Sequence, residues 1–164
     1  MNSEFILEAI DREFPDVILD ASESYGILTI EIKKTEIKKV IHHLKDSSLN
    51  FHFLTDICGI HYPNNPEKEI GVIYHLHNMV ENVRLRLKTF MPREEAEVDS
   101  LVDLYAGANW MERETFDFYG IKFKGHPDLR AILNMPDLGY HPLLKEYRLE
   151  DGTRADKNDL MFGR

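Results

Sequence analysis

The chain has 164 residues and a single cysteine, Cys58. One thiol excludes an internal disulfide, and it excludes a self-contained iron–sulfur cluster, which is held by about four thiolates. The sequence also lacks two glycine-rich phosphate-binding patterns, G-x-G-x-x-G at the start of a helix and G-x-x-x-x-G-K-[ST]. We therefore predict that the chain binds no cofactor. If the protein takes part in redox chemistry, the redox centres lie in other chains.

Positive charge is scarce as well. The formal net charge is −9, which argues against nucleic-acid binding because phosphates are bound by clustered Lys and Arg. No apolar run approaches the roughly 18 residues of a membrane span. The first residues carry acids where a signal peptide has a basic region, and no long apolar region follows. We predict a cytoplasmic chain without direct membrane insertion.

Hydrophobic periodicity predicts an α+β fold. Four apolar residues share the spacing of one helix face, i, i+3, i+4 and i+7: Ile37, Val40, Ile41 and Leu44. The expected strands are residues 16–21, 25–32, 51–62, 69–77 and 82–90. The expected helices begin at the caps Ser3, Thr35 and Asn109, with a further short helix over 98–105. The order α-β-β-α-β-β-β-α-α predicts a two-layer domain with helices on one face of a mixed sheet of about five strands.

One face of this predicted sheet is partly polar. In the strand 82–90, Arg84, Arg86 and Lys88 point away from the side that carries the apolar residues. This face therefore either meets water or meets another protein. We interpret Cys58, in a central apolar strand, as a buried residue that behaves like a small apolar side chain.

A second reading of the sheet is a metal site. His75 and His77 lie on one strand face and could begin a site in a small metal-dependent enzyme. In the symmetric register their cross-strand neighbours are Thr55 and Phe53, which add no third nitrogen, whereas a slip of one residue brings in His52. We interpret both histidines as surface or partner-facing residues and predict no metal site.

Three adjacent charges, Glu112-Arg113-Glu114, begin the last predicted helix. Successive helix residues point about 100° apart, so the three cover most of the circumference. The same helix carries residues that favour burial: Trp110, Met111, Thr115 and Phe118. We expect at least one of the charges to be buried beside a fixed counter-charge or to point at a partner. Arg113 can pair with Asp117 at i+4, and the alternative is a solvated helix face.

Residues 121–164 are predicted to form an extended docking arm with an acidic tail, attached to a core domain of residues 1–120. Two His-Pro units, at residues 126–127 and 141–142, favour turns and extended backbone. The apolar side chains between them have to lie on the parent domain or on another chain: Leu129, Ile132, Leu133 and Met135. The arm has no period long enough to build a second core. We therefore predict that partner chains order it.

The stretch from residue 112 to residue 133 also has a distinctive spacing. Glu-Arg-Glu is followed at fixed intervals by an acid, two apolar residues, a histidine, a basic residue and two apolar residues. The positions are Glu112, Arg113, Glu114, Asp117, Phe118, Tyr119, His126, Arg130, Ile132 and Leu133. This signature resembles that of the 30 kDa subunit family of respiratory complex I, the NADH:quinone oxidoreductase. Residues 53–63, 108–110 and 141–147 also look like the family. Ala131 and Leu144 depart from it, because a basic residue is common at both positions.

The resemblance implies a non-catalytic structural subunit in the hydrophilic arm of complex I. It implies partners among the quinone-site (49 kDa-type) and neighbouring cluster-bearing subunits, at the cytoplasmic side of the inner membrane. FMN, iron–sulfur clusters and quinone would then belong to other subunits. The implied partner interface comprises Glu112, Arg113, Glu114, Asp117, His126, Arg130, His141 and Lys145. A related ferredoxin- or hydrogenase-linked complex would hold an equivalent subunit, and this one sequence does not identify the electron donor.

Overall fold

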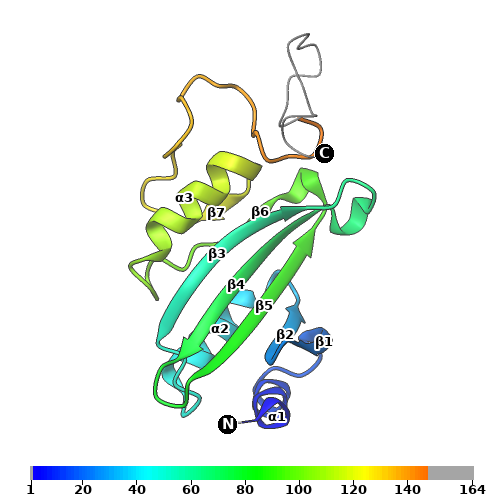
Figure 1. Cartoon of the computed structure of the whole chain (residues 1–164), viewed down its shortest axis with the longest axis vertical. Helices are drawn as coiled ribbons and strands as arrows, with labels where there is room; N and C mark the ends of the chain where they lie inside the picture. The colour runs from blue at the N-terminus through cyan, green and yellow to red at the C-terminus, as the bar shows by residue number, and fades with distance from the viewer. Residues whose placement is uncertain (1, 148–164) are drawn as a thin grey trace, which may run out of the picture.

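The computed structural model describes residues 2–147, which form the predicted two-layer α+β domain followed by an arm (Figure 1). The helices are α1 (Ser3–Glu13), α2 (Ile37–Asp46) and α3 (Ala108–Tyr119), with short 3-10 turns η1 (Pro66–Lys68) and η2 (Arg93–Glu95). The strands are β1 (Ile18–Ser24), β2 (Ile27–Ile32), β3 (Phe53–His61), β4 (Ile70–Asn78), β5 (Val83–Met91), β6 (Glu97–Asp99) and β7 (Lys122–Lys124). Within residues 2–147, no helix is long and apolar enough to cross a membrane.

The main sheet has the order β1-β2-β5-β4-β3, and β2–β5 is its parallel pair. Its core face is built from alternate residues of the strands, and α2 lies behind it in Figure 1. The predicted stripe of α2 is fully buried against this face. The inward side chains of β4 and β5 are buried too: Ile70, Val72, Tyr74, Leu76, Leu85 and Leu87. The helix period of 3.6 residues and the strand period of 2 therefore predicted these core residues correctly.

The three predicted helix caps are wrong. Asn2 caps α1 by accepting a hydrogen bond from the Phe5 N–H at 3.0 Å. Ser3 instead donates its hydroxyl to Glu23 on β1. Helices α2 and α3 begin after Glu36 and Gly107, and neither residue makes a side-chain cap bond. Each of these two helices thus starts within two residues of its predicted cap, at a position set by packing.

The predicted short helix over 98–105 is also wrong. Residues 97–99 form β6, which pairs in parallel with β7, and turns follow. The buried apolar residues of this stretch, Val98, Leu101 and Tyr105, have the spacing of one helix face. Tyr105 is fixed by a hydrogen bond from its hydroxyl to the Phe51 carbonyl at 2.7 Å. Here a strand followed by turns places its buried apolar residues at the spacing of a helix.

The pairing of β6 with β7 also bears on where the arm begins. Gly120 ends α3 in the left-handed conformation, with φ of 76°. Directly after it, Ile121 and Phe123 are buried in the core. The expected boundary at residue 120 therefore lies just before β7, a short strand that pairs with β6 of the core domain.

Candidate functional site

The centre of the candidate site is Asp117, a buried carboxylate on the face of α3 that meets the arm. Its Oδ2 accepts hydrogen bonds from the backbone N–H groups of Ile132, Leu133 and Asn134, at 3.0, 2.8 and 2.9 Å. Burial raises the pKa of Asp117, but these backbone donors outweigh it, so the pKa lies below the ordinary value. One side chain thus orders three consecutive residues of the arm.

Arg113 holds the residues just before these. Its guanidinium donates to the carbonyls of Arg130 and Ala131, at 3.2 and 3.0 Å. The predicted i, i+4 ion pair between Arg113 and Asp117 is therefore wrong. Both side chains instead bind arm backbone, the cation at carbonyls and the anion at N–H groups, because an irregular segment leaves both kinds of group unpaired.

Glu112 is fully buried, as expected for at least one of the three charges. It faces the protein interior, where it accepts hydrogen bonds from the Ser100 hydroxyl at 2.7 Å and the Leu101 N–H at 2.6 Å. The expected ionic counter-charge is replaced by these neutral donors, since Glu112 forms no ion pair within residues 2–147. Burial raises the pKa of Glu112, and the two hydrogen bonds oppose the shift.

The remaining residues of this helix follow the prediction only in part. Glu114 is exposed, and Trp110, which was expected to be buried, is 60% exposed. Met111 is half-buried and Thr115 is buried, where its hydroxyl bonds the Ile57 carbonyl of β3. Helix α3 therefore packs on the edge strand β3 and leaves Trp110 of its first turn exposed.

Two histidines of the predicted set tie the arm to the ends of α3. His126 accepts a hydrogen bond from the Asp128 N–H at Nδ1, so its Nε2–H donates to the Asn109 carbonyl at 3.1 Å. His141 donates from Nδ1 to the Asp117 carbonyl at 2.9 Å, and its ring lies against Gly120. A side chain at position 120 would collide with this ring.

The side chain of Arg130, by contrast, pairs with Asp128 on the surface, and only its backbone carbonyl is bound by α3, through Arg113.

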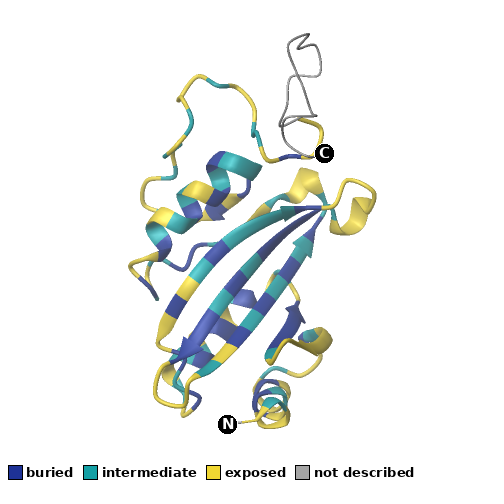
Figure 2. Cartoon of the chain, in the orientation of Figure 1, coloured by how far each residue is buried: buried dark blue, intermediate teal, exposed yellow. Residues whose placement is uncertain are grey.

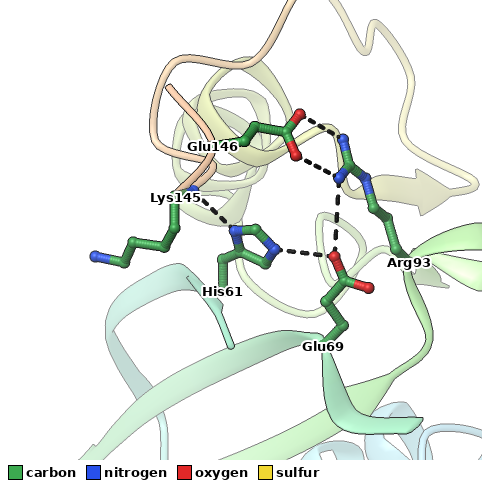
Figure 3. Close-up of polar contacts among 5 residues, drawn as sticks. All are labelled: His61, Glu69, Arg93, Lys145 and Glu146. Atoms are coloured by element: carbon green, nitrogen blue, oxygen red, sulfur yellow. Dashed lines mark hydrogen bonds and ion pairs between the residues drawn. The ribbon is translucent and has the colours of Figure 1, made fainter. Parts of the chain in front are cut away.

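The last described residues of the arm are held by a polar cluster that the sequence did not predict (Figure 3). The buried ring of His61 accepts the Lys145 N–H at Nδ1 and donates from Nε2 to Glu69 at 3.0 Å. Arg93 makes a two-point contact with Glu146, at 2.7 and 2.9 Å. The Lys145 ammonium points away from the cluster in Figure 3. Among these residues only Lys145 belonged to the predicted set, and it acts through its backbone.

The arm is thus anchored on its own domain, which corrects the expectation that partners alone order it. Its backbone groups are bound by α3 and the His61 cluster, whereas several of its large apolar side chains face outward. The exposed ones are Leu133 (66%), Met135 (67%), Tyr140 (43%), Leu143 (37%) and Tyr147 (37%). Leu144 is buried in the core, as are Ile121 and Phe123 at the start of the arm. That the residues of the predicted interface contact a partner chain stays a prediction.

The two histidines of β4 are engaged within the sheet. Arg86 donates from Nε to His75 Nε2 at 2.8 Å, and His77 contacts Asn82 at 3.2 Å. The strands are in the predicted register at Phe53–His77, but a β-bulge sets Asp56 opposite His75. No group of three or more His, Cys, Asp or Glu side chains within residues 2–147 is placed to hold a metal ion.

Cys58 was predicted to be buried, but it is half-buried. Burial and the neighbouring Asp56 carboxylate raise the pKa of Cys58 to about 11, so its thiol is protonated near neutral pH.

Residues 30–153 match the family model described as Respiratory-chain NADH dehydrogenase, 30 Kd subunit. The chain belongs to this family. The match spans most of the sheet, α3 and the arm, and so includes every residue of the predicted interface. Two solved structures have a fold similar to that of this chain. A trypsin-resistant fragment (1–134) of Nqo5 matches with a TM-score of 0.67 and 28% identity, over 79% of this chain and 100% of the fragment.

A chain of an archaeal respiratory membrane complex, the membrane-bound sulfane sulfur reductase, matches with a TM-score of 0.75 and 26% identity, over 89% of this chain and 85% of that one.

Relatives that are similar to this chain in sequence are subunits of differently named complexes. An NADH-quinone oxidoreductase subunit of Xanthobacter autotrophicus is 41% identical over 131 residues, which are 79% of this chain and 62% of the relative. An F(420)H(2) dehydrogenase subunit of Methanosarcina mazei is 39% identical over 150 residues, 90% of this chain and 92% of the relative. The chain therefore spans under two thirds of the first relative's length and nearly all of the second.

Proposed function

We propose that this chain is a non-catalytic structural subunit of the peripheral arm of a proton-translocating NADH:quinone oxidoreductase. In this role it supports electron transfer from NADH to quinone, while FMN, iron–sulfur clusters and quinone are bound by other subunits. Family membership supports the proposal. The complex would hold the chain at the cytoplasmic side of the inner membrane as a peripheral component.

The observation that carries this proposal is the construction of the arm. Its backbone is fixed to α3 by Arg113 and Asp117, and five of its large apolar side chains are exposed. A loop that only closed a fold would turn such side chains inward, because burying a large apolar side chain is worth about 1.5–3 kcal/mol. Several exposed large apolar side chains on one anchored segment favour a protein–protein contact. Its proposed partners are the quinone-site subunit and the neighbouring cluster-bearing subunits.

A second candidate is the equivalent subunit of a complex with another electron donor, such as a ferredoxin- or hydrogenase-linked complex. The observation that favours it is the F(420)H(2) dehydrogenase relative, whose identity is close to that of the NADH-linked one. The likeness to a sulfane sulfur reductase chain points the same way. The structural role would be unchanged, because the donor site would lie in another subunit.

Affinity capture tests both candidates. The tagged chain is purified from mild-detergent extracts of membranes, and the co-purifying subunits are identified by mass spectrometry. We expect quinone-site and cluster-bearing subunits, together with a flavin subunit that oxidises NADH. Capture of the same core subunits without NADH oxidation, but with oxidation of reduced F420 or ferredoxin, would select the second candidate. Recovery of the chain alone would refute the structural role.

A substitution on the arm tests the docking surface itself. Changing Leu133 and Met135 to Ser should leave the thermal unfolding of the isolated chain nearly unchanged, because both side chains are already exposed. The same change should release the chain from the captured complex. The matched control is the same change at Met79 and Val80, which are equally exposed at the β4–β5 turn. Equal retention of both double variants would show that the arm does not dock.

A further inference from the structure

The face of the main sheet opposite the helices is open. In Figure 1 no helix lies in front of β3, β4 and β5, and Figure 2 shows half-buried and exposed residues along these strands. Ile73 on the central strand β4 is only half-buried, and Phe53 on β3 is 50% exposed. A sheet normally buries the apolar part of a face against another layer. The open face is therefore a second surface on which a partner layer would fit.

This face carries the three cations of β5, Arg84, Arg86 and Lys88, which we name the β5 cation row. Arg84 is exposed, and the other two are half-buried. None of the three forms an ion pair with a carboxylate of residues 2–147. The carboxylates Glu31 and Asp56 lie on the same face, but Glu31 is bound by Lys68 and Asp56 lies 3.8 Å from His75.

The middle member of the row is pre-oriented. Arg86 uses its Nε–H to bind His75 Nε2 at 2.8 Å, which places the His75 proton on Nδ1, toward Asp56. Burial and the Arg86 charge lower the pKa of His75, so the ring stays neutral and adds no repulsion. The terminal nitrogens of Arg86 make no other hydrogen bond within the described chain. A fixed guanidinium with free terminal donors suits a carboxylate.

The geometry of the row suits a helix. Alternate residues of a strand are about 6.6 Å apart. Residues i and i+4 of a helix are about 6 Å apart along its axis, so acids at i, i+4 and i+8 would meet Arg84, Arg86 and Lys88 in turn. Phe53 lies in the same cross-strand row as His77 and Arg84, which gives an apolar contact beside the charges.

We propose that the open sheet face is a docking surface for an acidic helix of a neighbouring protein chain, whose carboxylates bind the β5 cation row. This assignment rests on the proposed function, in which the chain is one subunit of a larger assembly, and it adds a surface on another side of the domain from the arm. A polyanion such as nucleic acid or an anionic membrane fits less well, because its anionic surface extends beyond the three cations of the row to the rest of a chain whose net charge is −9.

Charge reversal in the assembled complex tests the proposal. Cells carry the R84E/K88E variant or the control R12E/K39E, which makes the same change in charge on exposed residues of α1 and α2. The complex is purified through a tag on another subunit, and this chain is quantified in it. We expect about tenfold less of the R84E/K88E chain than of wild type, and no change for the control. If R84E/K88E lowers the thermal midpoint of the isolated chain, R84Q/K88Q replaces it.

A zero-length carbodiimide cross-link gives an independent readout. In the wild-type complex Lys88 should couple to an Asp or Glu of a different polypeptide. A Lys88 link only to its own Glu31, or equal retention of both charge-reversal variants, would overturn the docking surface alone. Absence of the wild-type chain from the complex would overturn the proposed function as well. Binding of the isolated chain to phosphatidylglycerol vesicles, abolished by R84E/K88E, would assign the face to a membrane and overturn the protein partner.

Discussion

Replacing Asp117 by Asn should detach the arm from α3 without unfolding the domain. The carboxylate accepts three backbone hydrogen bonds at one oxygen. A hydrogen bond to a charged group contributes about 1.5–3 kcal/mol, against about 0.5–1.5 kcal/mol for a neutral pair. The amide oxygen can still accept, so the loss is about 2 kcal/mol rather than the whole interaction. This corresponds to about a 30-fold larger population of the open arm, since 1.36 kcal/mol is tenfold.

Limited trypsin digestion measures this population. The bond after Arg130 lies directly before the anchored residues, and its carbonyl is bound by Arg113. When opening and closing are fast, the cleavage rate follows the fraction of open arm. We expect cleavage after Arg130 to be about 30-fold faster in D117N, with thermal unfolding of the domain little changed. The matched control is D137N, the same change at an exposed position of the arm. Equal rates for D117N, D137N and wild type would refute the anchoring role.

The pH dependence of arm release has a defined sign. The pKa of Asp117 is lower in the folded arm than in a free aspartate. Its contribution to anchoring is therefore fully present above the ordinary value of about 3.9 and is lost as the pH falls through the folded pKa. Hydrogen exchange at the amides of residues 132–134 should accelerate over this range in wild type. D117N should lack this acceleration, apart from the intrinsic pH dependence of exchange.

Three further results are expected. G120A should lose at least about 1 kcal/mol of stability, because position 120 has positive φ and abuts His141, whereas G107A, with open space around it, should be nearly neutral. In wild type, unfolding stability should fall as the pH rises from the ordinary Glu value of about 4.3 through the raised pKa of Glu112, and E112Q should remove this slope. E146Q should speed amide exchange at Lys145 at low salt only, because the Arg93 pair is exposed.

Prediction from the sequence succeeded where burial alone determines structure. The stripe of α2 and the alternation of β4 and β5 appear as predicted, because most of their buried positions carry apolar side chains. The stretch 98–105 was mispredicted because its buried residues share the helical spacing.

The candidate site was predicted only in its residues and not in its contacts. Asp117 and Arg113 were recognised by their spacing, yet they bind backbone N–H and carbonyl groups, which every residue has and which leave no trace in a sequence. His61 and Lys145 meet from distant parts of the chain, and His61 acts through a ring nitrogen that no pattern identifies. Contacts of this kind depend on the path of the folded backbone.

The parallel pair of the main sheet, β2–β5, has a consequence for how the chain folds. Strands β3, β4 and β5 form successive antiparallel neighbours joined by short turns, so their contacts close small loops. The contact between Leu28 and Leu85 instead closes a loop that contains α2, β3 and β4. Contacts with large sequence separation slow folding, because the chain loses the entropy of closing a long loop before these contacts stabilise it. The β3–β5 meander should therefore form first, and the β1–β2 hairpin should join it in the later, rate-limiting step.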